Sequence, residues 1–117
     1  MEQTVTIIIN ELPYKNDKAW NALRLAGALL DQKVSVSLFL LEDGVDVGKE
    51  KQSIGKKKYN LEKMITSLLN RNLEVKACES CLKSCGVSKE KLITRVEISS
   101  MSALATLVKE SNKVLIF

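Results

Sequence analysis

The sequence of 117 residues contains no histidine and only one proline, one tryptophan, two tyrosines and two phenylalanines. Without an imidazole, the chain supplies no Cys-His or Ser-His-Asp nucleophile and no mixed Cys/His zinc site. The aromatic residues do not alternate with basic ones, so we do not expect nucleic acid to be bound directly by base stacking. The chain also lacks an apolar run near the roughly 20 residues of a membrane span, and its first residues lack a signal-peptide pattern. These absences predict a cytoplasmic protein that does not bind a membrane.

The bulk composition is that of an ordinary globular chain, with 45% hydrophobic and 27% charged residues. The length suits a single domain, spanning residues 1–117, that buries a core without disulfide staples. The formal net charge of +4 is modest and only weakly favours an anionic partner.

The spacing of apolar residues predicts strands that alternate with helices. Apolar runs indicate strands at residues 4–9, 34–41, 73–78, 95–98 and 113–117. Helical spacing and capping residues indicate helices from 17 to 31, after Asn60, and after Ser99 or Ser100. Residues 42–58 show no period and contain three glycines, which predicts a long loop. This order is typical of an α/β fold: a single-domain three-layer α/β/α sandwich with a mostly parallel five-stranded sheet, flavodoxin-like or Rossmann-like.

The only three cysteines, Cys78, Cys81 and Cys85, follow the third predicted strand closely. An odd number of cysteines in a reducing compartment favours reactive or metal-bound thiols over a structural disulfide. If a helix begins just after Cys78, all three sulfurs lie on one face of it. A thiol at the start of such a helix is favoured as the thiolate, and Lys76 and Lys83 would assist by their charge.

Several interpretations of the cysteines remain open. Small thiols commonly pack in a core, although three together at a strand end favour a chemical role. A metal site or cluster normally takes four ligands, so Cys78, Cys81 and Cys85 would need a carboxylate such as Glu79, or a site shared between subunits. A thioredoxin-type motif would follow the first strand and open a long helix, whereas this segment follows the third strand and soon meets Gly86. We expect no bound cofactor.

A second candidate site is a basic segment inside the predicted loop. Its five lysines stand against one glutamate: Lys49, Lys51, Lys56, Lys57 and Lys58. A loop of this length is usually functional or mobile, so the lysines either form a solvated loop or dock an anionic partner by charge. No GxGxxG or GxxxxGKS/T motif accompanies them, which argues against a nucleotide site.

Motifs along nearly the whole chain carry a family resemblance. They are Ile7–Asn10 with Pro13 and Tyr14, Leu23–Ala26, Leu38–Leu40 with Asp43, Tyr59 with Asn60, Cys78-x-x-Cys81 running into Gly86 and Val87, and Lys113–Phe117. These motifs resemble the DsrE/DsrF-like sulfur-relay family, and within it the YchN-like small proteins. The resemblance implies a compact α/β protomer that assembles into trimers or hexamers. It also implies that the cysteine after the third strand, here Cys78, accepts sulfane sulfur as a persulfide and passes it on.

The leading interpretation is therefore a sulfurtransferase-like persulfide carrier that exchanges sulfur with donor and acceptor proteins. Cys78 would carry the sulfur, and Cys81 and Cys85 would assist or resolve the persulfide. Many YchN-like members have Arg-Gly-Ile where this chain has Cys85, Gly86 and Val87, so the chain lacks that cation and gains a thiol. The alternative is a non-catalytic oligomeric binding module that holds a metal or cluster through the three thiolates. A helix set this small also leaves apolar surface for other subunits, which independently favours a homo-oligomer.

Overall fold

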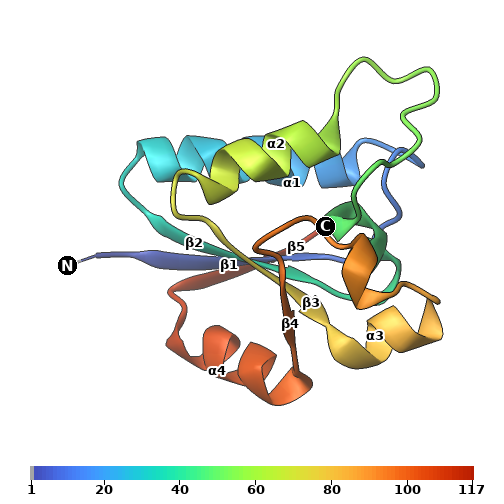
Figure 1. Cartoon of the computed structure of the whole chain (residues 1–117). Helices are drawn as coiled ribbons and strands as arrows, with labels where there is room; N and C mark the ends of the chain where they lie inside the picture. Colours follow the sequence, from blue (N-terminus) through green and yellow to red (C-terminus); the bar gives the residue numbers. More distant parts are fainter. Residues whose placement is uncertain (1) are drawn as a thin grey trace.

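The computed structural model describes residues 2–117, which build one five-stranded sheet with helices on both faces (Figure 1). The strands are β1 Thr4–Ile9, β2 Ser35–Leu40, β3 Glu74–Cys78, β4 Glu97–Ser99 and β5 Lys113–Ile116. The helices are α1 Lys18–Asp31, α2 Leu61–Leu69, α3 Glu79–Ser84 and α4 Met101–Glu110, with two 3-10 helices, η1 Glu42–Gly48 and η2 Lys89–Lys91. The strand order is β4-β3-β2-β1-β5 and every pairing is parallel. The predicted α/β sandwich is confirmed, with a fully parallel sheet.

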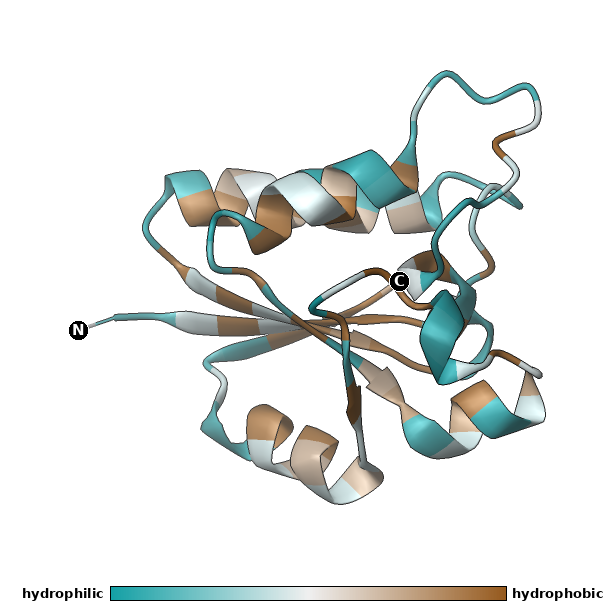
Figure 2. Cartoon of the chain, in the orientation of Figure 1, coloured by the Kyte–Doolittle hydropathy of each residue, from teal (hydrophilic) through white to brown (hydrophobic). Residues whose placement is uncertain are grey.

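The two faces of the sheet are covered unequally. Helices α1 and α2 lie together over one face, and α3 and α4 lie on the other side (Figure 1). Because side chains alternate along a strand, Ile7 and Ile9 of β1 enter the large cluster with α1 and α2, whereas Ile8 faces α4. Hydrophobic residues run along the strands between these layers (Figure 2). The cluster on the α4 side has four buried members: Ile8, Phe39, Cys78 and Leu104.

The bounds predicted from the sequence agree with those in the structure to within one or two residues for most elements. Asn60 caps α2 and Ser100 caps α4 through side-chain oxygens that accept backbone N–H bonds at 3.0 and 3.1 Å. Strand β4 begins at Glu97 rather than at the predicted residue 95, because Arg95 has a φ of 80° and does not continue a strand. Among residues 2–117, no helix has both the length and the apolar character needed to cross a membrane.

The prediction of a long loop at residues 42–58 is wrong in its first part. The 3-10 helix η1 forms there, and its Val45 and Val47 are fully buried. Gly44 makes this turn possible, since a Cβ atom at that position would lie 1.9 Å from the backbone oxygen of Ile9. A short 3-10 helix that buries alternate valines has no α-helical period, so the pattern gave no helix signal. The rest of the segment is irregular, as predicted.

Candidate active site

The cysteine segment lies at the carboxyl edge of the sheet, where β3 passes directly into α3. Cys78 is the last residue of β3 and the N-cap of α3, with extended backbone angles of φ −66° and ψ 122°. The helix ends after Ser84, and Gly86 at φ 69° takes the left-handed conformation that commonly follows a helix. Helix η1, which follows the neighbouring strand β2, packs against α3. Segments from two adjacent strands therefore meet around the thiols.

Cys78 is the most enclosed of the three thiols. The residue is 2% exposed and lies in the small cluster with Ile8, Phe39 and Leu104 of α4. Its sulfur is 3.3 Å from the hydroxyl oxygen of Ser80. Cys78 is therefore covered by α4 on its apolar side, while the start of α3 supplies its polar partner.

Hydrogen bonds favour the thiolate of Cys78 in spite of this burial. Burial raises the pKa of Cys78, because a charge is poorly solvated in an apolar cluster. The Ser80 hydroxyl, the Cys81 backbone N–H, the Cys81 thiol and the Ser80 backbone N–H lower the pKa, and together they outweigh burial. The pKa of Cys78 is thus below that of an ordinary thiol. Hydrogen bonds, rather than the expected charges of Lys76 and Lys83, produce this shift.

Cys81 differs from Cys78 in both exposure and protonation. It is half-buried, and its sulfur accepts a hydrogen bond from the backbone N–H of Glu42 at 3.2 Å. Burial raises the pKa of Cys81 most, the Glu42 N–H lowers it, and the hydrogen bond and charge of Cys78, followed by the charge of the Glu42 carboxylate, raise it further. The pKa of Cys81 is therefore above that of an ordinary thiol. The two coupled thiols favour a Cys78 thiolate that accepts a hydrogen bond from a protonated Cys81.

Glu42 reaches the thiols through its backbone. It has a φ of 53°, a left-handed conformation that costs a non-glycine residue about 1–2 kcal/mol. This conformation directs its N–H to Cys81, while its carbonyl oxygen accepts from the Cys85 thiol at 3.7 Å. Neither Glu42 nor Ser80 is among the site residues predicted from the sequence. Ser80 could have been predicted, because its hydroxyl stands two residues after Cys78 in the sequence. No sequence pattern predicts that Glu42 adopts a left-handed backbone conformation.

Cys85 lies apart from the other two thiols. It is exposed at the end of α3, where its sulfur lies 3.7 Å from the Glu42 carbonyl oxygen and 4.0 Å from a carboxylate oxygen of Asp43. Cys78 and Cys81 interact with each other, whereas Cys85 faces η1 and takes no part in that interaction. Within residues 2–117, no three Cys, Asp or Glu side chains are grouped so that they could hold a metal ion. A protomer therefore presents a thiol pair rather than a three-thiolate ligand set.

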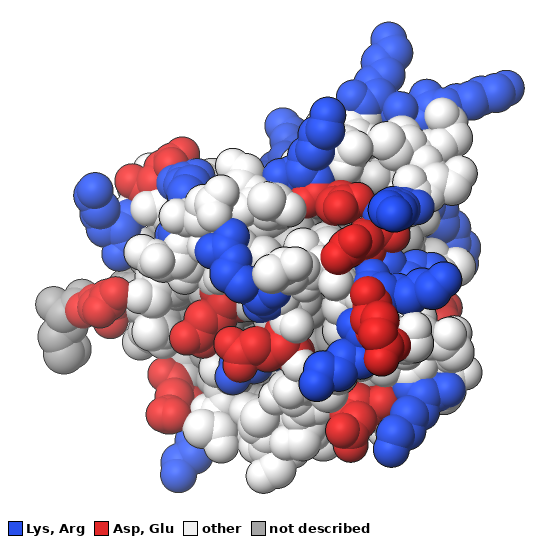
Figure 3. All heavy atoms as spheres, viewed as in Figure 1, with Lys and Arg blue, Asp and Glu red and all other residues white. Residues whose placement is uncertain are grey.

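The lysine segment lies away from the thiols. The loop with residues 56–58 projects beyond α1 and α2, whereas α3 lies on the side of α4, and Lys and Arg side chains gather on that projecting loop (Figures 1 and 3). Two of the lysines form ion pairs: Lys57 with Asp17 at 3.2 Å and Lys49 with Asp46 at 3.6 Å. The exposed members are Lys51, Lys56 and Lys58. Lysines and cysteines thus form separate surfaces at the same edge of the sheet.

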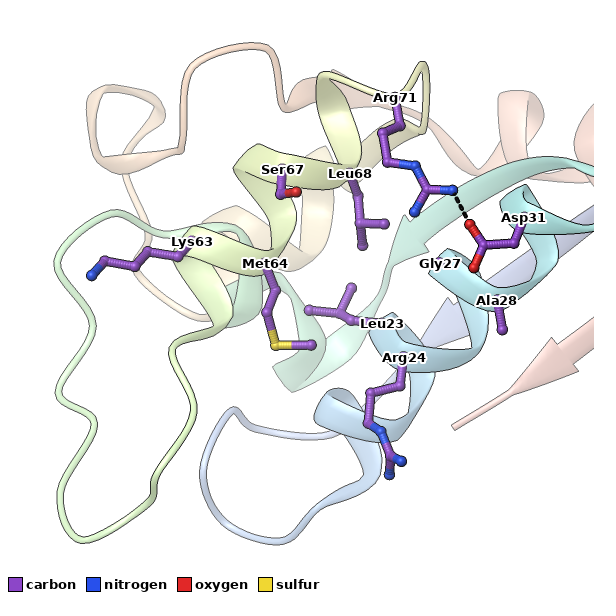
Figure 4. A pocket seen from close by; sticks show the side chains of 10 residues that line it. All are labelled: Leu23, Arg24, Gly27, Ala28, Asp31, Lys63, Met64, Ser67, Leu68 and Arg71. Atoms are coloured by element: carbon purple, nitrogen blue, oxygen red, sulfur yellow. Dashed lines mark hydrogen bonds and ion pairs between the residues drawn. The ribbon is translucent and has the colours of Figure 1, made fainter.

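A groove of about 580 Å³ also lies between α1 and α2 (Figure 4). Leu23 and Met64 point toward one another across it, and Asp31 of α1 forms an ion pair with Arg71 beyond α2. Because α1 and α2 cover the face opposite α4, this groove does not open onto Cys78. It is a surface feature separate from the thiol site.

The sequence matches known proteins along nearly its whole length. Residues 3–117 match the DsrE/DsrF-like family. The protein YchN of Escherichia coli is 37% identical over 117 residues, which cover 98% of this chain and 99% of that protein. An uncharacterized protein of Methanopyrus kandleri is 39% identical over 113 residues, which cover 97% of this chain and 93% of that protein.

Solved structures agree with the sequence matches. The crystal structure of YchN from Escherichia coli matches with a TM-score of 0.91 at 37% identity, covering 98% of this chain and 99% of that one. A protein of unknown function from Methanobacterium thermoautotrophicum matches with a TM-score of 0.75 at 15% identity, covering 99% and 100% of the two chains, and shows the fold alone. On these matches, and as its motifs predicted, the chain belongs to the DsrE/DsrF-like family.

Proposed function

We propose that the protein is a sulfur carrier, which accepts sulfane sulfur on Cys78 as a persulfide and passes it to an acceptor protein. The observation that carries this proposal is the position of Cys78 at the start of α3, where its sulfur is 3.3 Å from the Ser80 hydroxyl oxygen and hydrogen bonds lower its pKa in spite of burial. A thiolate attacks sulfane sulfur directly and needs no imidazole base. This chemistry suits a chain that has no histidine.

Loading is a single displacement at sulfur. The Cys78 thiolate attacks the outer sulfur of a donor persulfide, the S–S bond of the donor breaks, and the donor leaves as a thiolate. The new persulfide on Cys78 is an anion whose charge lies on the outer sulfur. Transfer to an acceptor is the same displacement, with the acceptor thiolate as the nucleophile.

The reaction requires access to a thiol that is 2% exposed. The cover on its apolar side is α4, which buries only Leu104. Leu107 of α4 packs half-buried on the same cluster, and a helix held by so few side chains moves at low cost compared with a helix that buries a full apolar face. We assign an outward movement of α4, in protomers whose α4 is not covered by another subunit, as the route by which the donor sulfur reaches Cys78.

We further propose that the carrier acts in the cytoplasm as a homo-oligomer, a trimer or hexamer as the family resemblance implies. A reducing compartment keeps the thiols free. Large apolar side chains are exposed on α4 and on the edge strand β5: Met101 at 58%, Val108 at 43% and Ile116 at 65%. Apolar residues beside an unpaired strand edge favour contact with another copy of the chain. Sedimentation at micromolar concentration tests this, and a monomer mass would contradict it.

Peptide mapping tests the carrier function. The reduced protein is incubated without oxygen with a limiting amount of inorganic polysulfide and digested with trypsin after short times. Cleavage after Lys76 and Lys83 separates Cys85 from the peptide that contains Cys78 and Cys81. We expect one added sulfur atom in the peptide of residues 77–83, retained in Cys81→Ser and lost in Cys78→Ser. Equal loading of Cys78→Ser and wild type in that peptide would contradict the proposal.

A further inference from the structure

Once Cys78 carries a persulfide, its neighbour Cys81 makes a second activity possible, and this inference rests on the function proposed above. We propose that, when no acceptor is present, Cys81 attacks the persulfide on Cys78, releases hydrosulfide and closes a Cys78–Cys81 disulfide. The protein would then reduce sulfane sulfur to sulfide once per protomer, until an external thiol reductant restores the dithiol.

The first turn of α3 holds the two reacting sulfurs together. Cys78 caps the helix and Cys81 follows three residues later, on the same side of that turn. Helical geometry separates such Cα atoms by about 5 Å, which is below the roughly 7 Å that a disulfide allows. Both residues also contact the apolar cluster on the α4 side. The Cα separation therefore permits a bond between them.

The step balances without another reactant. Cys81 gives its proton to the outer sulfur of the Cys78 persulfide anion, and its own sulfur attacks the inner sulfur of the persulfide. The bond between the Cys78 sulfur and the outer sulfur breaks as the Cys78–Cys81 bond forms. The outer sulfur leaves as HS⁻, so sulfane sulfur is reduced by two electrons while two thiols become a disulfide. A Cys81 that stays protonated beside Cys78 supplies the proton that this step requires.

Glu42 supports Cys81 in this step through its backbone. Its N–H donates to the Cys81 sulfur at 3.2 Å, and the left-handed φ of 53° holds it there. As the proton leaves Cys81, this N–H stabilises the negative charge that grows on the attacking sulfur, since hydrogen bonds to charged groups are stronger than neutral ones. The donor comes from η1, so docking of η1 on α3 sets the direction of attack.

Cys85 has a different surrounding from Cys81. Its sulfur faces the carbonyl oxygen of Glu42 at 3.7 Å and the carboxylate of Asp43 at 4.0 Å. Both contacts of Cys85 are oxygen acceptors, whereas the Cys81 sulfur accepts a hydrogen bond from a backbone N–H. Cys85 is also two turns from Cys78 rather than one, so Cys85→Ser is a matched control that removes a thiol from the same short segment.

A single-turnover experiment tests the inference. Reduced wild type, Cys81→Ser and Cys85→Ser are loaded with limiting inorganic polysulfide without oxygen, desalted, and followed by intact mass and by assay of released sulfide. Wild type should lose the added sulfur, become two hydrogens lighter than the reduced protein and release one sulfide per loaded protomer. Cys81→Ser should keep its persulfide at least about tenfold longer, because its resolving thiol is absent. Cys85→Ser should discharge like wild type.

A second variant removes the Glu42 carboxylate, whose charge also raises the pKa of Cys81. Glu42→Gly keeps the backbone N–H and suits the left-handed angle, so Cys81 should still discharge the persulfide, although the pKa of Cys81 should fall. Loss of discharge would assign the proton transfer to the carboxylate and overturn the role given to Cys81 as proton donor. The wild-type rate should also be the same at two protein concentrations, because the step is intramolecular.

The outcomes separate this inference from the carrier function. If Cys78 takes up no sulfur in any variant, the proposed function fails and the inference fails with it. If wild type loads Cys78 and keeps the persulfide as long as Cys81→Ser does, the carrier function stands and the discharge activity is overturned. Discharge that is lost in Cys85→Ser and kept in Cys81→Ser would also overturn it, because Cys85 would then be the resolving thiol.

Discussion

The two faces of the sheet bury very different amounts of apolar surface. On one face, α2 alone buries four residues and α1 another four, and both pack on the large central cluster. On the other face, α4 buries only Leu104. The reactive thiol of Cys78 lies on this second, thinly covered face. The comparison indicates that one face contributes most of the buried apolar surface of the fold, while on the other face α4 covers the Cys78 thiol.

The thin cover has a chemical consequence. A thiol in open solvent has an ordinary pKa and is accessible to any oxidant, whereas a thiol deep in a core is inert. Cys78 lies between these extremes, because α4 excludes water from it while α3 supplies hydrogen-bond donors that favour its thiolate. The comparison between the faces therefore predicts measurable differences in stability, in access and in reactivity.

The largest expected effect concerns stability. Ile65 of α2 is fully buried, and Leu104 of α4 is 5% exposed. Ile65→Ala should lower the free energy of unfolding by about 3–4 kcal/mol, and Leu104→Ala by about 2 kcal/mol, since the thin face relaxes more easily around a deleted side chain. Urea unfolding at one fixed protomer concentration measures both. An equal loss of unfolding free energy in the two variants would show that the two faces do not differ in how they relax around a deleted side chain.

The second effect concerns access to the thiol. Leu104→Ala should raise the rate at which iodoacetamide alkylates Cys78 by about tenfold, because α4 loses its buried anchor and opens more often. Ser102→Ala is a control on the same helix, since Ser102 is an exposed polar residue of α4. Mass spectrometry of the peptide of residues 77–83 measures alkylation of Cys78 in a Cys81→Ser background. An unchanged rate in Leu104→Ala would show that the donor reaches Cys78 by another route.

A third, smaller effect concerns the pKa of Cys78. Ser80→Ala removes a donor that favours the thiolate, so this pKa should rise. The thiolate would then form at higher pH, which slows alkylation near neutral pH by roughly threefold and leaves it unchanged in strong alkali. Ser84→Ala is the control, because Ser84 is in the same helix and donates instead to the Cys81 carbonyl oxygen. If the pH profile of Ser80→Ala matches that of wild type, Ser80 does not stabilise the thiolate.

The sequence predicts the fold well, because the signals for strands and helices are local. The run at residues 4–9, the caps Asn60 and Ser100, and the stop at Gly86 each act within a few positions. No local signal predicts the strand order β4-β3-β2-β1-β5. The first part of the 42–58 segment was missed because its burial depends on Gly44 approaching β1, a contact between segments far apart in the chain.

The environment of the thiols is harder to predict than their position. The sequence places Cys78 at a strand end, but the donor to Cys81 comes from Glu42, which is 39 residues away in the chain. The charges of Lys76 and Lys83 are visible in the sequence, yet the pKa shift comes from hydrogen bonds whose geometry appears only after folding. The separation of the lysine loop from α3 is likewise a tertiary property that composition cannot supply.

The smallest expected effect concerns that loop. Replacing Lys56, Lys57 and Lys58 with glutamine should change the rate at which inorganic polysulfide loads Cys78 by less than about twofold, because screening at physiological salt limits charge effects to about 8 Å. The salt dependence of this loading rate should also be unchanged. A protein donor that docks on the lysines would behave differently, since its association would slow and its salt dependence would flatten in the triple variant. If instead loading by polysulfide itself slows and loses its salt dependence, the lysines of the loop, or those of another subunit, lie close to the thiol in solution.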